Sequence, residues 1–264
     1  MGKPWACQQG AVASTGEWLL FLDADTEVRI GGLGRLAALA SSPDQVHSVC
    51  PYHRVVAAYE QLSAIFNVIM VVGVNAFTLV GGRSRRTGLF GQALLVSRQR
   101  YELVGGHGRV RAEALENLAL ARHFREGGAE CCSWLGHGTV HMRMFPEGLD
   151  HLIRSWSKGA VAGASHTSRS AVTGVSLWMT TLSVAAMLLP VALVTGSQFH
   201  DWAILLYALV MLQAGYLFKR VGSYWLIAAP LFPVLLFFYL WVFIKAARMK
   251  KRGGQLQWKG RDVA

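Results

Sequence analysis

Three long apolar runs in the last third of the chain restrict its possible folds more than any other feature. They cover residues 171–195, 202–218 and 223–244 and approach the length of about 20 residues that an α-helix needs to cross a bilayer. Pro230 and Pro233 interrupt the third run, which favours either a re-entrant segment or a third span. We therefore expect two or three transmembrane helices within residues 169–246.

Composition and charge agree with a membrane protein. Of the 264 residues, 53% are hydrophobic, the mean hydropathy is +0.33 and the formal net charge is +11. Much of the positive charge flanks the apolar runs, which favours an anionic membrane surface over nucleic acid as the partner. The four cysteines form no disulfide or zinc pattern, and adjacent Cys131 and Cys132 are interpreted as small buried hydrophobes in a reducing compartment.

The distribution of Lys and Arg predicts the orientation in the membrane. Basic residues precede the first run and follow the second at Lys219 and Arg220, whereas residues 196–201 contain none. The positive-inside rule then places the N-terminal part of the chain in the cytoplasm, on a multi-pass inner membrane protein. The basic tail, residues 247–264, would also be cytoplasmic if the third segment is re-entrant and outside if that segment is a true span.

A second apolar stretch, Trp18 to Leu22, ends on Asp23 and Asp25. It is predicted to be a strand buried on both faces of a mostly parallel sheet, with the two carboxylates at the rim of a cleft. On an extended segment the i, i+2 spacing would point both side chains the same way, which suits Mg²⁺ or Mn²⁺ carrying a diphosphate. The alternative is a strand that simply ends in an acidic turn.

Residues 5–14 resemble a helix that leads directly into this strand. A helix followed by a buried strand is the second half of a crossover unit, whose first strand we expect upstream of this sequence. The sheet would then have an exposed edge, which a partner chain supplying the missing half could cover.

Further elements alternate along the first 100 residues. We expect a helix at 30–39, a strand at 46–50 and, after a basic loop at 82–86, a strand at 89–96. The apolar segment 59–80 is almost long enough to span a membrane, but its internal Asn and Gly residues favour a buried or membrane-surface helix.

Residues 90–128 contain two features with chemical potential. Gly105-Gly106 predicts a tight backbone turn that a substrate can approach closely. In the following helix, expected at 112–124, Glu116 is either a catalytic base or a solvated residue at the positive helix end. Residues 148–164 then form an amphipathic pattern typical of an interfacial helix, in which Trp156 would be a membrane anchor.

Several short motifs occur in an order that resembles family 2 glycosyltransferases, and within them the membrane-bound branch that includes carotenoid (diaponeurosporenoate) glycosyltransferases. Each motif is weak alone, but together they cover nearly the whole chain. The motifs are Gly2-Lys3, Phe21-Leu22-Asp23-Ala24-Asp25-Thr26, Gly91-Gln92, Arg98 with Tyr101 and Val104-Gly105-Gly106-His107, Glu116-Asn117-Leu118-Ala119, and Trp156-Ser157-Lys158-Gly159.

The resemblance implies a GT-A fold and inverting transfer of a hexose from a UDP-sugar to an acceptor hydroxyl. Asp23 and Asp25 would hold the divalent metal and the donor diphosphate, neutralising charge on the leaving UDP. It also implies donor contacts for Lys3 and Lys158. Acceptor contacts are implied for a further set of residues, namely Gln92, Gly105, Gly106, His107 and Trp156.

This chain departs from the family pattern at two positions. The residue expected to remove the acceptor proton is the second acid of a Glu-Asp pair, and here it is Asn117, whose amide takes no proton at neutral pH. Either Glu116 substitutes, or the chemistry is impaired, or the chain has another role. Processive relatives carry an Arg-Trp pair whose Trp stacks on the acceptor, whereas here Ser155 precedes Trp156.

The sequence as a whole therefore predicts an α/β chain with four parts. Residues 1–145 would form a GT-A domain that is incomplete at its N-terminus, 146–168 an interfacial helix, 169–246 the membrane helices and 247–264 a basic tail. The expected function is hexose transfer from a UDP-sugar to a lipophilic acceptor such as a carotenoid acid or a glycolipid precursor. The alternatives are transfer to polyprenyl phosphate and a degenerate, non-catalytic membrane relative that acts as an interaction module.

Overall fold

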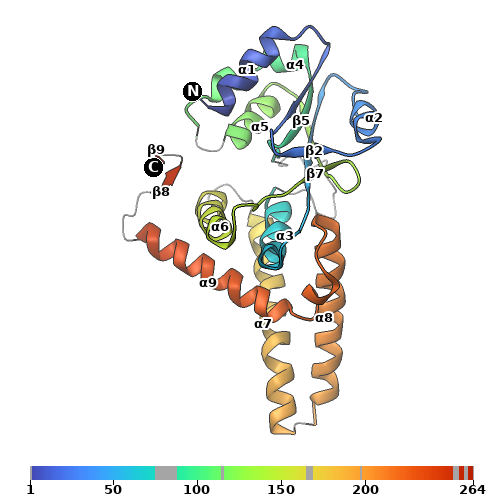
Figure 1. The fold of residues 1–264 in the computed structure, drawn as a ribbon, viewed down its shortest axis with the longest axis vertical. Coiled ribbons are helices and arrows are strands. Elements are labelled where there is room, and N and C mark those ends of the chain that lie inside the picture. The colour runs from blue at the N-terminus through green and yellow to red at the C-terminus, as the bar shows by residue number, and fades with distance from the viewer. Residues whose placement is uncertain are drawn as a thin grey trace. The chain divides into compact units, whose positions relative to one another are not determined.

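The computed structural model describes residues 2–74, 88–113, 116–164, 169–196, 198–251, 256–258 and 261–263. They form two compact units, which Figure 1 shows in one ribbon. The first comprises residues 1–52 and 74–143, and the second comprises residues 53–73 and 144–264. The second unit thus includes residues 53–73 in addition to the C-terminal part of the chain. The expected basic loop at 82–86 lies outside the described residues.

The first unit contains a four-stranded mixed sheet with the order β1-β5-β3-β6. β1 (Trp18–Leu22) pairs antiparallel with β5 (Ala93–Ser97), β5 pairs antiparallel with β3 (Gln45–Cys50), and β3 pairs parallel with β6 (Glu130–Leu135). The prediction of a mostly parallel sheet is therefore wrong. A strand packed on both faces has the same apolar run in either direction, so the sequence alone could not distinguish the two.

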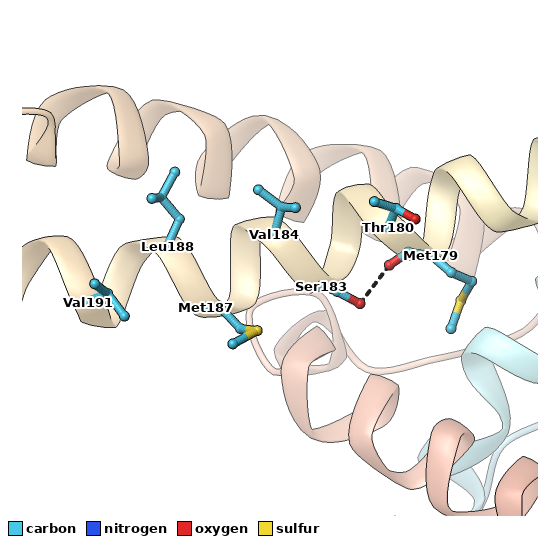
Figure 2. Close-up of a pocket in the computed structure, with 7 residues that line it drawn as sticks. All are labelled: Met179, Thr180, Ser183, Val184, Met187, Leu188 and Val191. Atoms are coloured by element: carbon cyan, nitrogen blue, oxygen red, sulfur yellow. Dashed lines mark hydrogen bonds between the residues drawn. The ribbon is translucent and has the colours of Figure 1, made fainter.

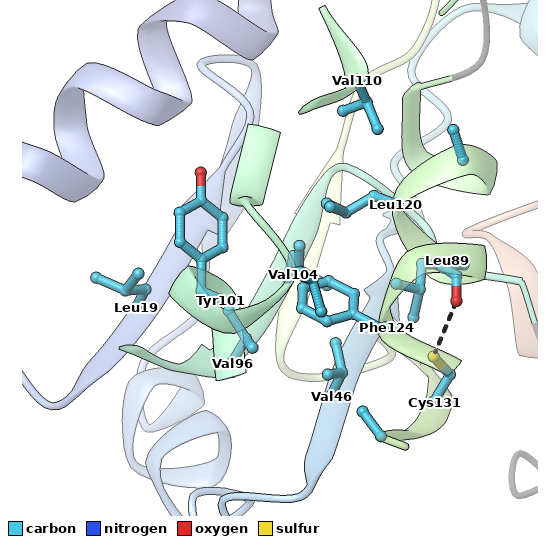
Figure 3. Close-up of a cluster of buried hydrophobic side chains, with 14 of the residues drawn as sticks. Leu19, Val46, Leu89, Val96, Tyr101, Val104, Val110, Leu120, Phe124 and Cys131 are labelled. Carbon is cyan, nitrogen blue, oxygen red and sulfur yellow. Dashed lines mark hydrogen bonds between the residues drawn. The ribbon is translucent and has the colours of Figure 1, made fainter. Parts of the chain in front are cut away.

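Side chains from both faces of β1 are packed, as expected. Leu19 belongs to the cluster in Figure 3, which also takes residues from α4 (Arg98–Leu103) and α5 (Glu116–Glu126), and Phe21 packs against this cluster. Leu20 points to the other face and packs with Leu36 of α2 (Gly32–Ala37). The strand is nevertheless only half-buried, because it is an edge strand of the described sheet.

Two further elements shape the region beyond the carboxyl end of β1. α1 (Lys3–Ala13) begins with Pro4 in its first turn and contacts the 3₁₀ helix η3 (Gly106–Val110). Arg98 fixes the α1–β1 connection by donating hydrogen bonds to the carbonyls of Ala11, Ser14 and Gly16 at 2.8–3.0 Å.

A second sheet has the order β2-β7-β4, with β2 (Thr26–Val28), β7 (Val140–Met142) and β4 (Tyr52–His53).

The second unit contains three helices long and apolar enough to cross a membrane: α7 (Arg169–Thr195), α8 (His200–Val221) and the first 18 residues of α9 (Phe232–Lys251). The earlier apolar segment forms η1 (Ala58–Ser63) and α3 (Ala64–Gly73), which are too short to span and largely buried within this unit. For these residues the expectation of a buried helix is confirmed.

The connection from α8 to α9 runs back along α8. Tyr207 donates a hydrogen bond to the carbonyl of Pro230 at 2.6 Å, and its ring lies 4.9 Å from that of Phe232. Tyr207 lies fourteen residues before the end of α8, roughly 21 Å along the helix axis. This connection includes the 3₁₀ helix η4 (Leu226–Ala228). α9 then starts part-way along the α7–α8 pair and runs obliquely away from it (Figure 1).

The amphipathic helix α6 (Leu149–Ala164) packs Leu152 and Trp156 of its apolar stripe against protein. Trp156 is only 8% exposed, stacks on Phe66 at 4.8 Å and donates a hydrogen bond to Ser63 Oγ at 3.1 Å. Leu152 and Val242 of α9 complete the same cluster. The described contacts of Trp156 are therefore those of a core residue, and they provide neither lipid anchorage nor an open surface for stacking on an acceptor.

A shallow groove of about 500 Å³ follows one side of α7. The hydroxyl groups that line the groove bond within the helix. Thr180 donates to the carbonyl of Ser176, and Ser183 donates to that of Met179 (Figure 2). The surface left to a neighbour is apolar, as expected for a helix in contact with lipid. The lining residues are Met179, Thr180, Ser183, Val184, Met187, Leu188 and Val191.

Candidate functional site

The two aspartates at the end of β1 occupy a tight turn. The backbone N–H and the hydroxyl of Thr26 both donate to the carbonyl of Asp23, at 3.0 and 2.6 Å. Asp25 therefore lies in the turn and not on an extended segment, so the strand argument for two carboxylates pointing the same way was wrong. Asp25 is exposed and makes no hydrogen bond or ion pair with any described residue.

Lys3 joins this turn to the first helix and to β5. Its ammonium lies 2.5 Å from Asp23 Oδ1 and donates a hydrogen bond to the carbonyl of Gly91 at 2.8 Å. The backbone N–H of Asp23 donates to the carbonyl of Gln92 at 2.9 Å, which extends the β1–β5 pairing to the turn. A cation from the first turn of α1 therefore lies directly at the carboxylate end of β1.

The first turn of α5 brings Asn117 to the same place. A Cβ atom added to Gly91 would overlap the Asn117 amide, so only glycine allows this approach. Neither the Asn117 amide nor the Glu116 carboxylate has a hydrogen bond or ion pair within the described residues. Close by in sequence, Gln92 Oε1 is buried without a described partner. The side chains of Glu116 and Asn117 are thus available to a ligand.

Gly105 and Gly106 form the predicted tight turn. Both have positive φ angles, of 80° and 51°, and a Cβ on Gly106 would overlap the ring of Tyr101. The turn delivers His107, whose side chain is almost fully buried at 2% exposure. Its ring lies 4.8 Å from that of Phe21, which is two residues before Asp23 and on the same side of the chain.

Electrostatic effects confirm that these groups share one small region. Burial, with a smaller effect of the nearby Lys3 ammonium, lowers the pKa of His107 to about 4. Burial also raises the pKa of the Cys7 thiol; Lys3 opposes this, whereas Asp23 and Glu116 add to it. Lys3, Asp23, Glu116 and His107 therefore lie within electrostatic reach of one another or of Cys7 at neutral pH, where His107 is uncharged.

The donor atoms at the turn suit a divalent cation only in part. No group of three or more His, Cys, Asp or Glu side chains that could hold a metal occurs among the described residues. A Mg²⁺ ion commonly uses one or two carboxylates and completes its shell with substrate phosphates and water. The exposed Asp25 with the neighbouring Asp23 fits such a partial set, although Lys3 now occupies one oxygen of Asp23.

The structure brings together most of the residues expected from the sequence. Lys3, Asp23, Gln92, His107 and the Glu116-Asn117 pair meet in the first unit, whereas Lys158 and Trp156 belong to the second. From the sequence, Tyr101 was named only within a motif and Gln8 not at all, yet the Tyr101 hydroxyl bonds to both Gln8 and His107. No local pattern could have identified the contact between Gln8 and Tyr101, because the two residues are 93 positions apart.

Two comparisons relate the chain to known proteins. The model of glycosyl transferase family 2 matches residues 1–71. The chain is also 30% identical over 267 aligned residues to 4,4'-diaponeurosporenoate glycosyltransferases from Staphylococcus aureus strains USA300, NCTC 8325 and MRSA252. These alignments cover 100% of this chain and 71% of each relative. Neither comparison supports the separate partner chain considered from the sequence.

Proposed function

The chain belongs to glycosyltransferase family 2, and we propose that it transfers a hexose, with inversion, from a UDP-sugar to a lipophilic acceptor at the membrane. The observation that carries the proposal is the pairing of Lys3 with Asp23 at the end of β1, beside the unpaired carboxylate of Asp25. A cation next to two carboxylates suits a metal-bound diphosphate, because the Lys3 ammonium can leave the Asp23 carboxylate and pair with a phosphate oxygen.

In this proposal Asp23 and Asp25 hold Mg²⁺ or Mn²⁺, and Lys3 contacts a phosphate of the donor. The metal, when bound, neutralises negative charge on the departing UDP. Lys158 is the second proposed donor contact, through its positive charge. A substrate contact is also proposed for Gln92, whose Oε1 has no hydrogen-bond partner among the described residues.

Acceptor activation is assigned to Glu116. As the acceptor oxygen bonds to the anomeric carbon and the bond to UDP breaks, the proton of a hydroxyl or un-ionised acid acceptor passes to this carboxylate. Asn117 has no group that can take it. No described residue forms an ion pair or hydrogen bond with the Glu116 carboxylate, which supports the assignment. The Gly105-Gly106 turn, with His107, forms the wall of the proposed acceptor side.

The lipophilic acceptor is supported by the membrane helices and by the name of the relatives, which act on 4,4'-diaponeurosporenoate. We therefore propose a carotenoid acid or a similar apolar acid as the acceptor. A cytoplasmic position for the first unit is proposed from the basic residues around α7 and α8.

The proposal is tested by transfer of label from UDP-glucose. Membranes that contain the chain should move label into an organic-extractable lipid when Mg²⁺ or Mn²⁺ is present. Asp25→Asn should reduce this at least 100-fold, whereas Asp44→Asn, the same change at an exposed carboxylate paired with Arg100, should retain most of it. Transfer that survives Asp25→Asn would remove the metal role.

A non-catalytic role is the second candidate, and the observation that favours it is Asn117 at the expected base position. The two candidates differ in one measurement. A non-catalytic chain should transfer no label from any UDP-sugar, even after Asn117→Asp restores a carboxylate, and should still bind its partner in the membrane.

A further inference from the structure

A hydrogen-bond chain from α1 fixes the orientation of the Gln8 amide. The backbone N–H of Gly108 lies 2.9 Å from Gln8 Oε1 and can only donate, so the oxygen and not the amide nitrogen must face it. The hydroxyl of Tyr101 lies 3.1 Å from the same oxygen. Because Oε1 only accepts, Tyr101 must donate its single proton to Gln8.

This assignment determines which nitrogen of His107 carries the proton. The Tyr101 hydroxyl oxygen also receives the backbone N–H of His107 at 3.0 Å and lies 2.9 Å from His107 Nδ1. Since the hydroxyl proton is committed to Gln8, Nδ1 must be the donor. A neutral imidazole has one N–H, so Nε2 carries a lone pair. Figure 3 shows the Tyr101 hydroxyl projecting from the core cluster toward α1.

The lone pair of Nε2 is available to a ligand. No described residue bonds to it, yet it is not among the fully buried atoms that lack a partner, so it keeps contact with solvent. The packing of the ring on Phe21 and the influence of Lys3 place it beside the Asp23 turn. Asp23 and Glu116 also carry charge in this region. A hydrogen-bond acceptor atom with a fixed orientation, such as Nε2, suits a substrate O–H group as its donor.

The same arrangement makes His107 a poor proton acceptor. The catalytic histidine of a triad is oriented by a carboxylate, whose negative charge stabilises the imidazolium. Here the orienting groups are a neutral phenol and a neutral amide, and the charge that acts on the ring is the ammonium of Lys3. His107 can therefore accept a hydrogen bond strongly without removing the proton.

We propose that His107 Nε2, which Gln8 and Tyr101 keep unprotonated, accepts a hydrogen bond from a substrate hydroxyl and so positions that substrate. The inference rests on the proposed glycosyl transfer. The hydroxyl belongs to the transferred sugar or to the acceptor, and the two sources can be separated by experiment. His107 then acts in specificity and positioning, and the proton transfer is left to Glu116.

The test pairs enzyme variants with substrate analogues. His107→Leu should lower kcat/KM for UDP-glucose about 10- to 100-fold, as expected for loss of one fixed hydrogen bond. The loss should disappear with one of the 2-, 3-, 4- or 6-deoxyglucose donors if the hydroxyl is on the sugar. It should disappear with an acceptor lacking its hydroxyl if the acceptor supplies it. An equal loss with every analogue of both kinds overturns the proposal.

Two further measurements separate the proposal from a structural role and from the proposed function. Tyr101→Phe keeps the ring but no longer fixes which nitrogen of His107 carries the proton. It should therefore show the same pattern with the analogues, with a smaller loss of kcat/KM of roughly 3- to 10-fold. In ¹⁵N NMR of histidine-labelled protein, with His107→Gln used for assignment, Nδ1 should be the protonated nitrogen, and UDP-glucose should shift the Nε2 signal. A protonated Nε2 overturns the proposal whether or not transfer occurs. Absence of transfer from any UDP-sugar, with Nδ1 still protonated, contradicts the proposed function instead.

Discussion

The Lys3 ammonium lies 2.5 Å from Asp23 Oδ1 and also bonds to the Gly91 carbonyl, so one side chain connects α1, the turn after β1 and the start of β5. The side chains of Lys3 and Asp23 remain 33% and 26% exposed, which leaves the pair open to a ligand. A partly exposed ion pair contributes little to stability, about 0–1 kcal/mol. Its position is therefore better explained by ligand binding than by folding.

Replacing Lys3 should affect donor binding more than turnover. Lys3→Met removes a charge-assisted contact with the donor diphosphate, so we expect the KM for UDP-sugar to rise about 10- to 100-fold while kcat changes less than 5-fold. Steady-state kinetics over a donor titration measure both values. Arg122→Met removes an exposed cation of α5 and serves as the control. A fall in kcat alone would contradict a role in donor binding.

The glycine turn offers a matched pair of substitutions. Gly106→Ala combines positive-φ strain with overlap of the Tyr101 ring, so we expect a loss of roughly 2–4 kcal/mol. Gly128→Ala has a similar positive φ and no atom within 4 Å of the new Cβ, so strain alone should cost about 1 kcal/mol. Thermal unfolding of the purified protein measures the difference. Equal losses would mean that the Tyr101 contact does not restrict position 106.

The pKa of His107 predicts how stability depends on pH. Burial lowers this pKa from 6.5 to about 4, so between these values the unfolded chain binds a proton that the folded chain does not. Stability should then fall as the pH decreases from about 6.5 to about 4, by up to roughly 3 kcal/mol. The His107→Gln variant lacks this contribution. Unfolding of both proteins at pH 7 and 4.5 isolates it, and parallel curves would contradict the lowered pKa.

The role of Glu116 is tested together with its neighbour. Glu116→Gln removes the proposed base and should lower kcat at least 100-fold with little change in donor KM. Asn117→Asp in the natural background should change kcat less than 5-fold, because Glu116 already takes the proton. A gain of 100-fold or more from Asn117→Asp would instead identify an impaired site at position 117. Rates measured with one saturating acceptor decide between these outcomes.

The sequence predicted the elements around the site but not their pairing. The apolar run before Asp23, the helix before it and the Gly105-Gly106 turn were all recognised, because each depends on local residue pattern. Strand direction was wrong for β1, since an antiparallel strand packed on both faces has the same composition as a parallel one. The turn at Asp25 was missed because the D-x-D pattern fits both an extended and a turned backbone.

Contacts between residues far apart in the chain could not be predicted from the sequence either. The stripe of α6 was correctly predicted as amphipathic, but periodicity does not say whether protein or lipid covers it. The covering residues are Phe66 and Val242, which are separated from Trp156 by 86 or more positions. The chain from Gln8 through Tyr101 to His107 is equally non-local, and only the folded structure identifies it.

The last prediction concerns the side of the membrane on which the tail lies. The hydrogen bond from Tyr207 to Pro230 shows that the chain returns along α8 before α9 begins, and α9 then packs against α6 and α3. Such a re-entrant limb would place Lys219 and the end of α9 on the same side, in agreement with their positive charge. Fusion reporters after residue 251 and within 219–222 should both report the cytoplasm, whereas one at residue 196 should report the opposite side. A tail reporter active only outside the cytoplasm would establish α9 as a full span and contradict the re-entrant path.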